Sequence, residues 1–404
     1  MARKIIKNIS PLEIKNPKQI DLLSPWNLKK ISKVECIRKS DAKKILKIAS
    51  DFFVNENLHI TKKQRIDILK KTIKLLTKNS KKFSDLIALE GGKPLKDSKV
   101  EVARAINGLE LCIDALKKCH GTEIPMSLNE ASSDKIAYTK KYPVGPVFAI
   151  SAFNHPLNLI VHQVGPAIAS GCPIIIKPAL DTPATCYEFI NLLIESGLPA
   201  GFCQMINTDD HSITEIFIKD DIIAFFSFIG SSKVGWKLKS KLSAGTKCAL
   251  EHGGIASVII DKDTNIKEVM PSIIRGAFYH AGQVCVSIQK VIVHEEIVDE
   301  FLSLMSQSIK KLKVGDPSKN TTDVGPLIRP GELERIHKLI QKSIKNGAEL
   351  VCGGKAKSKT TYECTVIKNP KPNDEINKVE IFGPVLCVYE YKGLEDAIEK
   401  ANHD

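Results

Sequence analysis

Hydrophobic and polar positions divide the chain into stretches of different periodicity. Between residues 41 and 118, apolar side chains recur every three or four positions with lysine and glutamate between them, as at Ile45, Ile48 and Phe52. This period predicts amphipathic helices. Residues 119–143 instead combine glycine, proline and serine with a short alternating stretch, which indicates an extended ribbon rather than a core element.

From Pro143 onward, short apolar runs alternate with helical patterns. The runs lie at 147–151, 173–177, 203–207, 224–229 and 247–250, and the helical patterns lie at 157–170, 183–196, 212–219 and 233–244. Strands and helices that alternate at this pitch predict βαβ units and a parallel sheet. A second region of mixed strands and helices follows Gly254. The pattern therefore predicts an α/β fold, and 404 residues are too many for one ordinary core, so we expect at least two domains.

Composition excludes several classes of protein. Hydrophobic residues make up 43% of the chain and charged residues 26%, which is ordinary for a globular protein. No apolar run is long enough to cross a bilayer, and the basic start lacks the apolar core of a signal peptide. We therefore expect a cytoplasmic protein with no membrane partner. The eleven cysteines contain no CxxC pair, which argues against a disulfide framework and against a metal site.

The net charge of +13 raises the question of a nucleic-acid partner. The lysines are spread along the chain and interleaved with acids, and no basic stripe carries interspersed aromatic residues. We therefore expect a solvated basic surface and no nucleic-acid partner. Attraction for a phosphorylated or carboxylated substrate remains an open alternative.

One cysteine lies at a predicted turn between a helix and a strand. The helix runs to about His280 and breaks at Gly282, and an alternating strand begins near Ser287. Cys285 could therefore face a cleft while its own backbone N–H points at a bound oxygen. A thiol attacks as the thiolate, which requires a base or a positive field nearby. A buried, inert cysteine is the alternative. Neither His280 nor His155 has a partner at a recognisable spacing, so both are interpreted as structural.

A glutamate ends one of the apolar strands. Glu251 follows the run at 247–250 and precedes Gly253 and Gly254. The carboxyl edge of an open parallel sheet is where such folds bind ligands. Partial burial there would raise the pKa of this carboxyl and suit it to deprotonating a water molecule. A surface acid at the end of a strand is the alternative.

Three other strand ends carry polar groups. The turn with Gly230, Ser231 and Gly235 opens a helix after an apolar strand, and its N–H groups could hold a pyrophosphate, although the spacing is not GxGxxG. Lys177 ends a buried strand, so its ammonium needs an anion or a ribose. Asn154 follows another strand, and its amide could donate to a developing oxyanion.

Taken in this order, the peptides resemble the aldehyde dehydrogenase superfamily. The match runs from about Asp21 to the last residue, and the stretch from Asn154 to His162 resembles the branch that acts on small hydroxylated or phosphorylated aldehydes such as lactaldehyde and glyceraldehyde phosphate. Four more peptides take part, at Glu90–Leu95, Pro143–Val147, Gly197–Gly201 and Glu380–Val385. Each peptide is unspecific alone, but the ordered set is specific.

The resemblance implies a domain organisation. Residues 1–118 and 144–253 would form a Rossmann-like dinucleotide-binding domain, residues 254–404 a second α/β domain for catalysis, and residues 119–143 a protruding β-ribbon for oligomerisation. A homodimer or homotetramer is implied for the full-length protein. The chain stops before the glycine-rich segment and final strand that normally close the catalytic domain, so the resemblance also implies an incomplete C-terminus.

The resemblance assigns a role to each motif. Cys285 would be the nucleophile and Glu251 the base that activates water, while the Asn154 amide and the Cys285 N–H would form the oxyanion hole. The implied cofactor is NAD or NADP, held by Phe153, Lys177, Gly230, Ser231, Gly235, Glu380 and Phe382. An aldehyde would then be oxidised to a carboxylic acid through a thiohemiacetal and a thioester.

Some alternatives stay open. A relative that passes the acyl group to coenzyme A or phosphate would share most of these residues, although Glu251 favours a free acid as the product. A relative that has lost turnover and retains a structural or binding role is a second alternative. Leu180 lies where NAD-selective members often carry a glutamate, so NADP stays as open as NAD.

Overall fold

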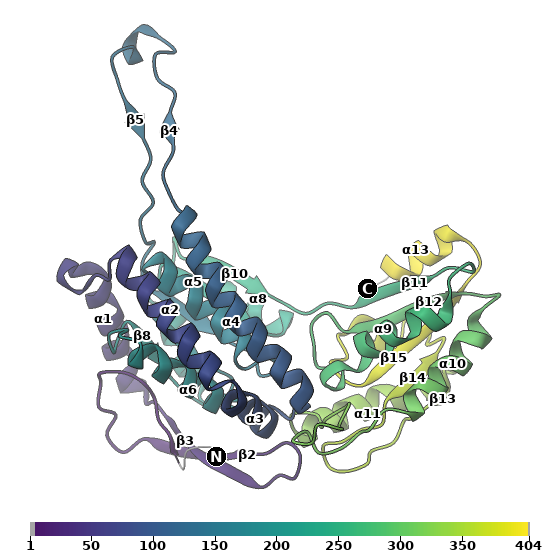
Figure 1. Cartoon of the computed structure of the whole chain (residues 1–404). Coiled ribbons are helices and arrows are strands. Elements are labelled where there is room, and N and C mark those ends of the chain that lie inside the picture. Colours follow the sequence, from purple (N-terminus) through teal and green to yellow (C-terminus); the bar gives the residue numbers. More distant parts are fainter. Residues whose placement is uncertain (1–4, 403–404) are drawn as a thin grey trace.

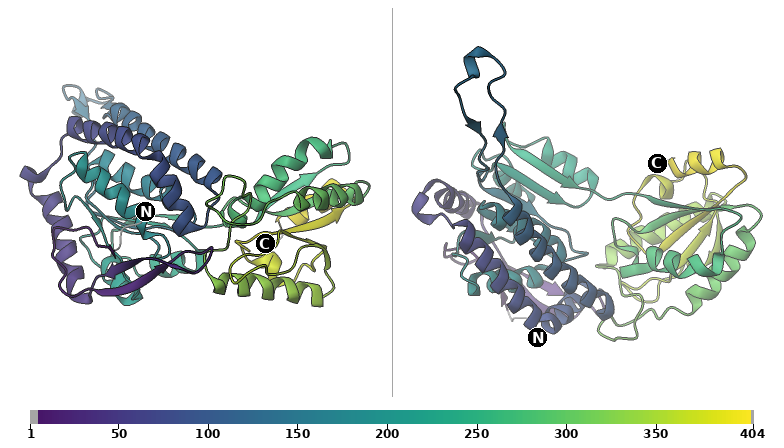
Figure 2. Two further views of the ribbon diagram at one scale, coloured as in Figure 1. Left: turned by 60° about the horizontal axis from the view of Figure 1, so that its bottom comes forward. Right: turned by 45° about the horizontal axis from the view of Figure 1, so that its top comes forward.

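The computed structural model describes residues 5–402, which form two lobes side by side with a long ribbon projecting from the first (Figure 1 and Figure 2). Each lobe is built on its own five-stranded sheet. The apolar cores are also separate, and the main cluster of the second lobe comprises residues between Ile260 and Val388. The α/β class that the sequence pattern predicts is confirmed.

The sheet of the first lobe is entirely parallel. Its strands are β6 (Val147–Ile150), β7 (Ile174–Lys177), β8 (Cys203–Met205), β9 (Phe225–Ile229) and β10 (Lys247–Glu251), in the order β10-β9-β6-β7-β8. Successive side chains point to opposite faces, so Val147 and Ala149 join one core cluster while Phe148 joins the other. The strand order reverses at β6, and the crevice beside such a point is where doubly wound sheets bind ligands.

Helices cover both faces of this sheet. The helices of the lobe are α1 (Lys39–Val54), α2 (Lys62–Lys78), α3 (Ser80–Gly91), α4 (Leu95–Lys118), α5 (Asn158–Ser170), α6 (Pro183–Glu195), α7 (His211–Ile218) and α8 (Ser232–Lys239). The period at 41–118 thus corresponds to four helices. Helices α2 to α6 contribute to the larger cluster, while α1, α7 and α8 contribute to the smaller one on the opposite face.

A small sheet near the N-terminus was not predicted by the hydrophobic pattern. It contains β1 (Ile5–Ile6), β2 (Lys18–Leu23) and β3 (Lys30–Cys36), in the order β1-β3-β2. β1 runs parallel to β3, and β2 runs antiparallel to it. Most side chains of β2 are exposed, so this strand lacks the continuous apolar run that marks the strands of the central sheet.

The ribbon leaves the lobe after α4. Its strands β4 (Glu123–Ile124) and β5 (Ala137–Tyr138) pair antiparallel. The two arms approach closely at Gly121, where a Cβ atom would lie 1.6 Å from the carbonyl oxygen of Thr139. Ile124, Ile136 and Tyr138 are exposed along it. The extended, protruding form is confirmed, while its role in oligomerisation remains a prediction.

The second lobe has a mixed sheet. Its strands are β11 (Ala256–Ile260), β12 (Ile288–His294), β13 (Glu349–Cys352), β14 (Thr365–Lys368) and β15 (Val385–Tyr391), in the order β11-β12-β15-β14-β13. All neighbours are parallel except β13, which is antiparallel to β14. Its helices are α9 (Ile266–Phe278), α10 (Val298–Lys310), α11 (Pro330–Lys345), α12 (Glu375–Lys378) and α13 (Leu394–Asn402).

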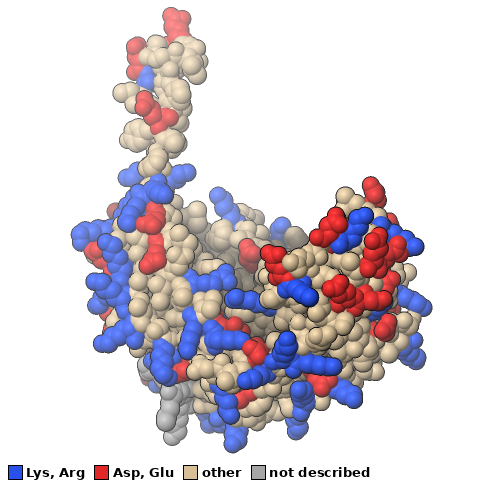
Figure 3. All heavy atoms as spheres, turned by 45° about the vertical axis from the view of Figure 1, so that its right-hand side comes forward, with Lys and Arg blue, Asp and Glu red and all other residues tan. Residues whose placement is uncertain are grey.

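Figure 3 shows a hollow between the two lobes. The lobes also meet through close backbone contacts. A Cβ atom at Gly325 would lie 2.1 Å from the carbonyl oxygen of Gly92, so the two segments touch only because a glycine is present. Nearby, the N–H of Leu95 donates to the carbonyl of Pro317 over 2.8 Å. Within residues 5–402, no helix is both long enough and apolar enough to cross a membrane.

Candidate active site

The polar strand ends of the first lobe gather at one edge of its sheet. Asn154 follows β6, Lys177 ends β7, Gly230 follows β9 and Glu251 ends β10. Because these four strands are parallel neighbours, their carboxyl ends lie side by side. The second lobe faces this edge with the turn that carries Cys285 and with the loop at 380–383. The sequence-predicted groups therefore come from both lobes.

The turn before Cys285 has an unusual backbone. Helix α9 ends at Phe278, and the next residues include His280, Ala281 and Gly282 with φ angles of 48°, 56° and 70°. Left-handed backbone costs non-glycine residues about 1–2 kcal/mol each. At Gly282 a Cβ atom would lie 2.0 Å from the carbonyl oxygen of Gly383, so only glycine fits. The turn ends with the Cys285 side chain exposed rather than packed in the core.

The charges around Cys285 differ from the positive field that would lower the pKa of its thiol. Partial burial raises the pKa of the thiol, and the carboxylates of Glu380 and Glu251 raise it further. The N–H groups of Cys285 and Val286 act in the opposite direction but do not outweigh these effects. The charges that act on the thiol are thus two carboxylates rather than cations, and together with burial they favour the protonated thiol at neutral pH.

The amide of Asn154 reaches across to the cysteine turn. Its Nδ2 donates to the carbonyl oxygen of Gln283 over 3.0 Å, two residues before Cys285. Asn154 is buried, and its Oδ1 has no partner among the described residues. The side chain of Gln283 in turn donates to the carbonyl of Pro326 (3.2 Å) and accepts the N–H of Ile328 (2.9 Å). Gln283 lies in the turn that the sequence analysis assigned to Cys285, but no role of its own was predicted for Gln283.

Glu251 is exposed, so the partial burial expected for it is absent. Its backbone carbonyl accepts the N–H of Gly230 over 3.1 Å, which ties the ends of β10 and β9 together. Its carboxylate acts on His162 of α5. Partial desolvation lowers the pKa of His162, Arg104 of α4 lowers it further, and Glu251 raises it. Arg104 and Glu251 therefore both lie within electrostatic reach of His162, and sequence reasoning singled out neither Arg104 nor His162.

Lys177 has the character of a ligand-binding cation. Burial lowers the pKa of its ammonium, while Cys36 and Asp181 raise it. Its Nζ atom forms no hydrogen bond or ion pair with another described residue. A partly buried ammonium without a partner is costly, so a hydroxyl or anion is expected to bind there.

The glycine turn before α8 differs in detail from a simple phosphate cradle. The N–H of Gly230 is already bonded to Glu251. At Gly235 a Cβ atom would lie 2.2 Å from Nε2 of His252, so this glycine makes room for the imidazole, which also contacts the Trp236 ring. Ser231 occupies the N-cap position of α8, yet no side chain caps the helix. The first turn of α8 therefore remains available to an anion.

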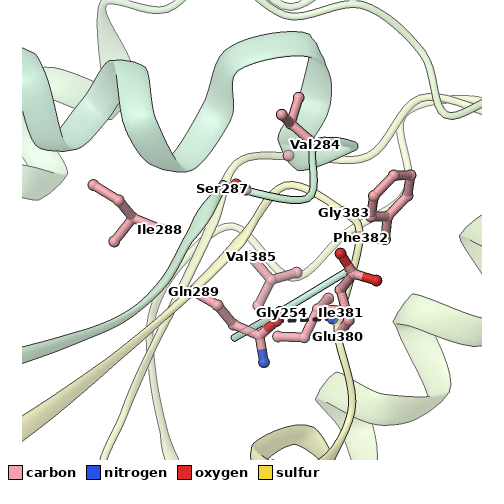
Figure 4. Close-up of a pocket in the computed structure, with 11 residues that line it drawn as sticks. Gly254, Val284, Ser287, Ile288, Gln289, Glu380, Ile381, Phe382, Gly383 and Val385 are labelled. Carbon is pink, nitrogen blue, oxygen red and sulfur yellow. Dashed lines mark hydrogen bonds between the residues drawn. The ribbon is translucent and has the colours of Figure 1, made fainter. Parts of the chain in front are cut away.

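The loop with Glu380 and Phe382 closes the edge from the second lobe (Figure 4). Glu380 accepts the N–H of Gly254, and burial raises the pKa of its carboxyl although that N–H lowers it. A Cβ atom at Gly253 would lie about 2 Å from this carboxylate. The Phe382 ring, on a backbone with a φ of 52°, lies edge-on to Phe153 of the first lobe at 5.8 Å.

A second glutamine, absent from the sequence interpretation, anchors this loop. Gln289 is buried in β12 and donates to the carbonyls of Ile376 (3.1 Å) and Val379 (2.9 Å). It also accepts the N–H of Ile381 over 2.8 Å, which is the dashed line in Figure 4. A glutamine just before the apolar run at 291–293 of this buried strand is the signal that could have identified it.

The unsatisfied groups at this edge fit a dinucleotide. Lys177 offers an unpaired ammonium, the first turn of α8 offers uncapped N–H groups, and Oε1 of Glu380 is buried without a hydrogen-bond partner. These suit ribose hydroxyls and a pyrophosphate. In the part of the chain that the structure describes, no three His, Cys, Asp or Glu side chains are grouped so that they could hold a metal ion.

Comparison with known proteins identifies the class. Residues 13–404 match the model of the aldehyde dehydrogenase family, and the chain belongs to that family. It is 32% identical to a 3-sulfolactaldehyde dehydrogenase of Priestia aryabhattai, over 95% of this chain and 80% of that protein. It is 34% identical to a lactaldehyde dehydrogenase of Methanococcus aeolicus, over 96% of this chain and 82% of that protein.

Solved structures agree with this assignment. Glyceraldehyde-3-phosphate dehydrogenase GapN of Methanocaldococcus jannaschii, complexed with NADP, is 31% identical with a TM-score of 0.90, covering 96% of this chain and 84% of that one. A betaine aldehyde dehydrogenase of Staphylococcus aureus in complex with NAD+ is 25% identical with a TM-score of 0.93, covering 98% and 82%. This chain is therefore an NAD(P)-dependent aldehyde dehydrogenase by family.

Proposed function

We propose that this chain oxidises a small hydroxylated or anionic aldehyde to the carboxylic acid, with Cys285 as the nucleophile. The observation that carries the proposal is an exposed thiol two residues after Gln283, whose backbone carbonyl accepts the Asn154 amide from the other lobe. An exposed thiol next to hydrogen-bond donors is what addition to a carbonyl requires.

Each residue would act at a defined atom. The Cys285 thiol would give its proton to solvent water, and the thiolate sulfur would bond to the aldehyde carbon. The carbonyl electrons move to the oxygen, which accepts hydrogen bonds from Asn154 Nδ2 and the Cys285 N–H. Bound NAD(P)+ supplies the hydride acceptor. Glu251 then takes a proton from water as the water oxygen attacks the thioester, which releases the acid and the thiol.

The cofactor would be held by residues of both lobes. Lys177 would bind the adenosine ribose, the turn with Gly230, Ser231 and Gly235 would line the pyrophosphate, and Glu380 would bind the nicotinamide ribose. Phe153 and Phe382 would lie beside it. The unpaired Lys177 ammonium and the orphan Glu380 oxygen support this assignment.

The substrate class is supported by a cation within electrostatic reach of His155 and His162. Arg104 is exposed, and it forms no ion pair within residues 5–402. Its charge acts on His155 and His162, on the α4 and α5 side of the site. A guanidinium there suits a carboxylate, sulfonate or phosphate. Three relatives are named for 3-sulfolactaldehyde, lactaldehyde and glyceraldehyde 3-phosphate, and these three aldehydes share a small hydroxylated carbon skeleton.

Steady-state kinetics test the proposal. Lactaldehyde, glyceraldehyde and glyceraldehyde 3-phosphate are each supplied with NAD and with NADP, and the reduced nicotinamide is followed by its absorbance. The wild type should oxidise at least one of these aldehydes with at least one of the two cofactors. Cys285→Ala should still bind the cofactor but retain less than about a tenth of the activity. No turnover with any pair, or a fully active Cys285→Ala variant, contradicts the proposal.

Two further arms separate the alternatives. Arg104→Met should lower kcat/KM for glyceraldehyde 3-phosphate more than for glyceraldehyde, and Arg104→Lys should lie between. Equal losses for the two substrates would show that Arg104 takes no part in substrate recognition.

The acyl acceptor is tested separately. Coenzyme A or inorganic phosphate should not raise the rate. A rate that depends on either one would instead support the acyl-transferring alternative.

A further inference from the structure

A buried ion pair lies directly behind the segment that carries Asn154. Lys93, after α3, and Glu101, in α4, are each 1% exposed and form the pair. Lys93 Nζ also donates to Nδ1 of His155 over 2.8 Å. Breaking such a pair leaves an uncompensated charge in the interior, so its partners must stay in place.

The second oxygen of Glu101 holds the start of α5. Its Oε1 accepts the N–H groups of Leu157 (2.9 Å) and Asn158 (3.1 Å), where the helix has no side-chain cap of its own. Burial raises the pKa of Glu101, but the ammonium of Lys93 outweighs it, so the pKa lies well below its usual range. The ionised carboxylate also suits the positive end of the helix.

His155 connects this pair to the cysteine turn. Because its Nδ1 accepts from an ammonium, the ring is neutral, and burial together with Lys93 lowers its pKa accordingly. The ring stacks on Tyr279 of the second lobe, with centroids 6.4 Å apart and planes at 19°. Tyr279 begins the left-handed turn that leads to Cys285.

These residues belong to a closed series of contacts that crosses the interface between the lobes at two places. Asn154 donates to the carbonyl of Gln283, and the Gln283 side chain donates to the carbonyl of Pro326. The Pro326 ring packs against Gly92, where a Cβ atom would lie 2.8 Å from it. Gly92 precedes Lys93, whose ammonium returns to His155, the neighbour of Asn154.

We propose that Lys93, Glu101 and His155 form a positioning unit that holds the Asn154 amide in register with the Cys285 turn across the lobe interface. This inference rests on the proposed function, because it assigns Asn154 to the oxyanion. None of the three residues needs to touch the substrate for this role. A donor must lie within a few tenths of an ångström of its ideal place, so loss of the unit lowers kcat more than cofactor binding.

His155→Phe is the most selective variant. Phenylalanine keeps a ring on Tyr279 and leaves the Lys93–Glu101 pair intact, but it removes the acceptor Nδ1. We expect kcat to fall on the order of tenfold, with the KM for the cofactor within about twofold of wild type. The matched control is His337→Phe, which removes an Nδ1 hydrogen bond of the same 2.8 Å length, to Tyr362, within the second lobe. The control should keep the wild-type kcat.

A double-mutant cycle distinguishes positioning from general packing. If the unit acts through the Asn154 amide, His155→Phe should lower kcat by less than about twofold further once Asn154→Ala is present. Reductions that multiply would show that His155 acts independently of Asn154, and would overturn the proposal.

A second pair of variants keeps the proposal testable if a single change unfolds the protein. Lys93→Met leaves a buried carboxylate unpaired, and we expect a large loss of thermal stability. Adding Glu101→Gln removes that charge, while the glutamine oxygen can still accept the N–H of Leu157. The double variant should therefore regain its Tm but not its kcat. Recovery of both would contradict the positioning role.

Alkylation of Cys285 by iodoacetamide provides a measurement that needs no turnover. With the Asn154 contact loosened, the turn opens more often, and His155→Phe should raise the rate constant about threefold or more. If the wild type oxidises no aldehyde but alkylation responds in this way, the proposed function fails while the positioning unit stands. If the wild type is active and neither kcat nor alkylation changes in His155→Phe, the unit fails.

Discussion

The carboxylate of Glu380 raises the pKa of the Cys285 thiol, from the loop that follows α12 in the same lobe. Glu251 acts in the same direction from the other lobe and to a smaller extent. The thiol is therefore within electrostatic reach of two acids that the proposed function uses for other purposes. Its reactivity should depend on both of them.

Alkylation of Cys285 across a pH series measures this dependence. We expect the midpoint of the rate profile to lie above the usual value for a thiol, because burial and both carboxylates disfavour the thiolate. Glu380→Gln should move the midpoint to lower pH, and Glu251→Gln should move it less. Glu375→Gln, at an exposed position of α12, is the control and should leave the midpoint unchanged. A shift to higher pH in Glu380→Gln would contradict the assignment.

Loss of the Glu251 carboxylate should uncouple the two halves of the reaction. In Glu251→Gln the thiol can still add to the aldehyde, but the water that attacks the thioester lacks its base. We expect a rapid burst of about one reduced nicotinamide per active site, followed by slow turnover. Stopped-flow absorbance measures both phases. An unchanged steady-state rate would reject the water-activating role.

Leu180 should control the choice between NAD and NADP. It follows Lys177 by three residues at the carboxyl edge of the sheet. A carboxylate there should repel a 2′-phosphate, so Leu180→Glu should raise the KM for NADP by about tenfold relative to NAD. Leu180→Gln has nearly the same shape without the charge and serves as the control. If both variants change the ratio equally, shape rather than charge decides the preference.

Glu90 should make stability depend on pH. It is fully buried, and its two oxygens accept the N–H groups of Ala184 and Thr185 at the start of α6, each over 2.8 Å. Burial raises its pKa from 4.5 to about 7. The folded chain thus retains a proton that the unfolded chain loses, so the free energy of unfolding should fall as the pH rises from 4.5 to 7.

Glu90→Gln removes this contribution to the pH dependence of the free energy of unfolding, because glutamine does not ionise. The stability of wild type relative to Glu90→Gln should therefore drop by about 2–3 kcal/mol between pH 5 and pH 8. Urea unfolding at the two pH values measures the difference. Glu110→Gln, on the exposed face of α4, should show no such change. A difference that grows in favour of wild type at high pH would show that the helix N-terminus outweighs burial.

The sequence could predict which strand ends carry the chemistry, because apolar runs mark the strands and parallel strands share one edge. Glu251, Lys177 and Asn154 were placed in this way. The pattern could not predict the electrostatics at Cys285, since the carboxylate of Glu380 arrives from a loop about a hundred positions away. Nor could it predict that Glu251 would be exposed, because burial depends on how closely the second lobe approaches.

Contacts made by single side chains were also beyond prediction. Gly235 looked like part of a phosphate cradle, yet the neighbour that needs its missing side chain is His252. His155 looked structural because no partner stood at a helical spacing. Its partner Lys93 lies 62 residues earlier in the chain. Pairings of this kind depend on the packing of α4 against α5, which hydrophobic periodicity does not specify.

The two lobes keep their apolar interiors apart, since no residue of the second lobe's main cluster belongs to a cluster of the first. Heat inactivation and unfolding are therefore separable events. On warming, the two lobes should separate first, and activity should be lost while the far-ultraviolet ellipticity of both lobes persists. Cooling from that state should restore activity without any refolding.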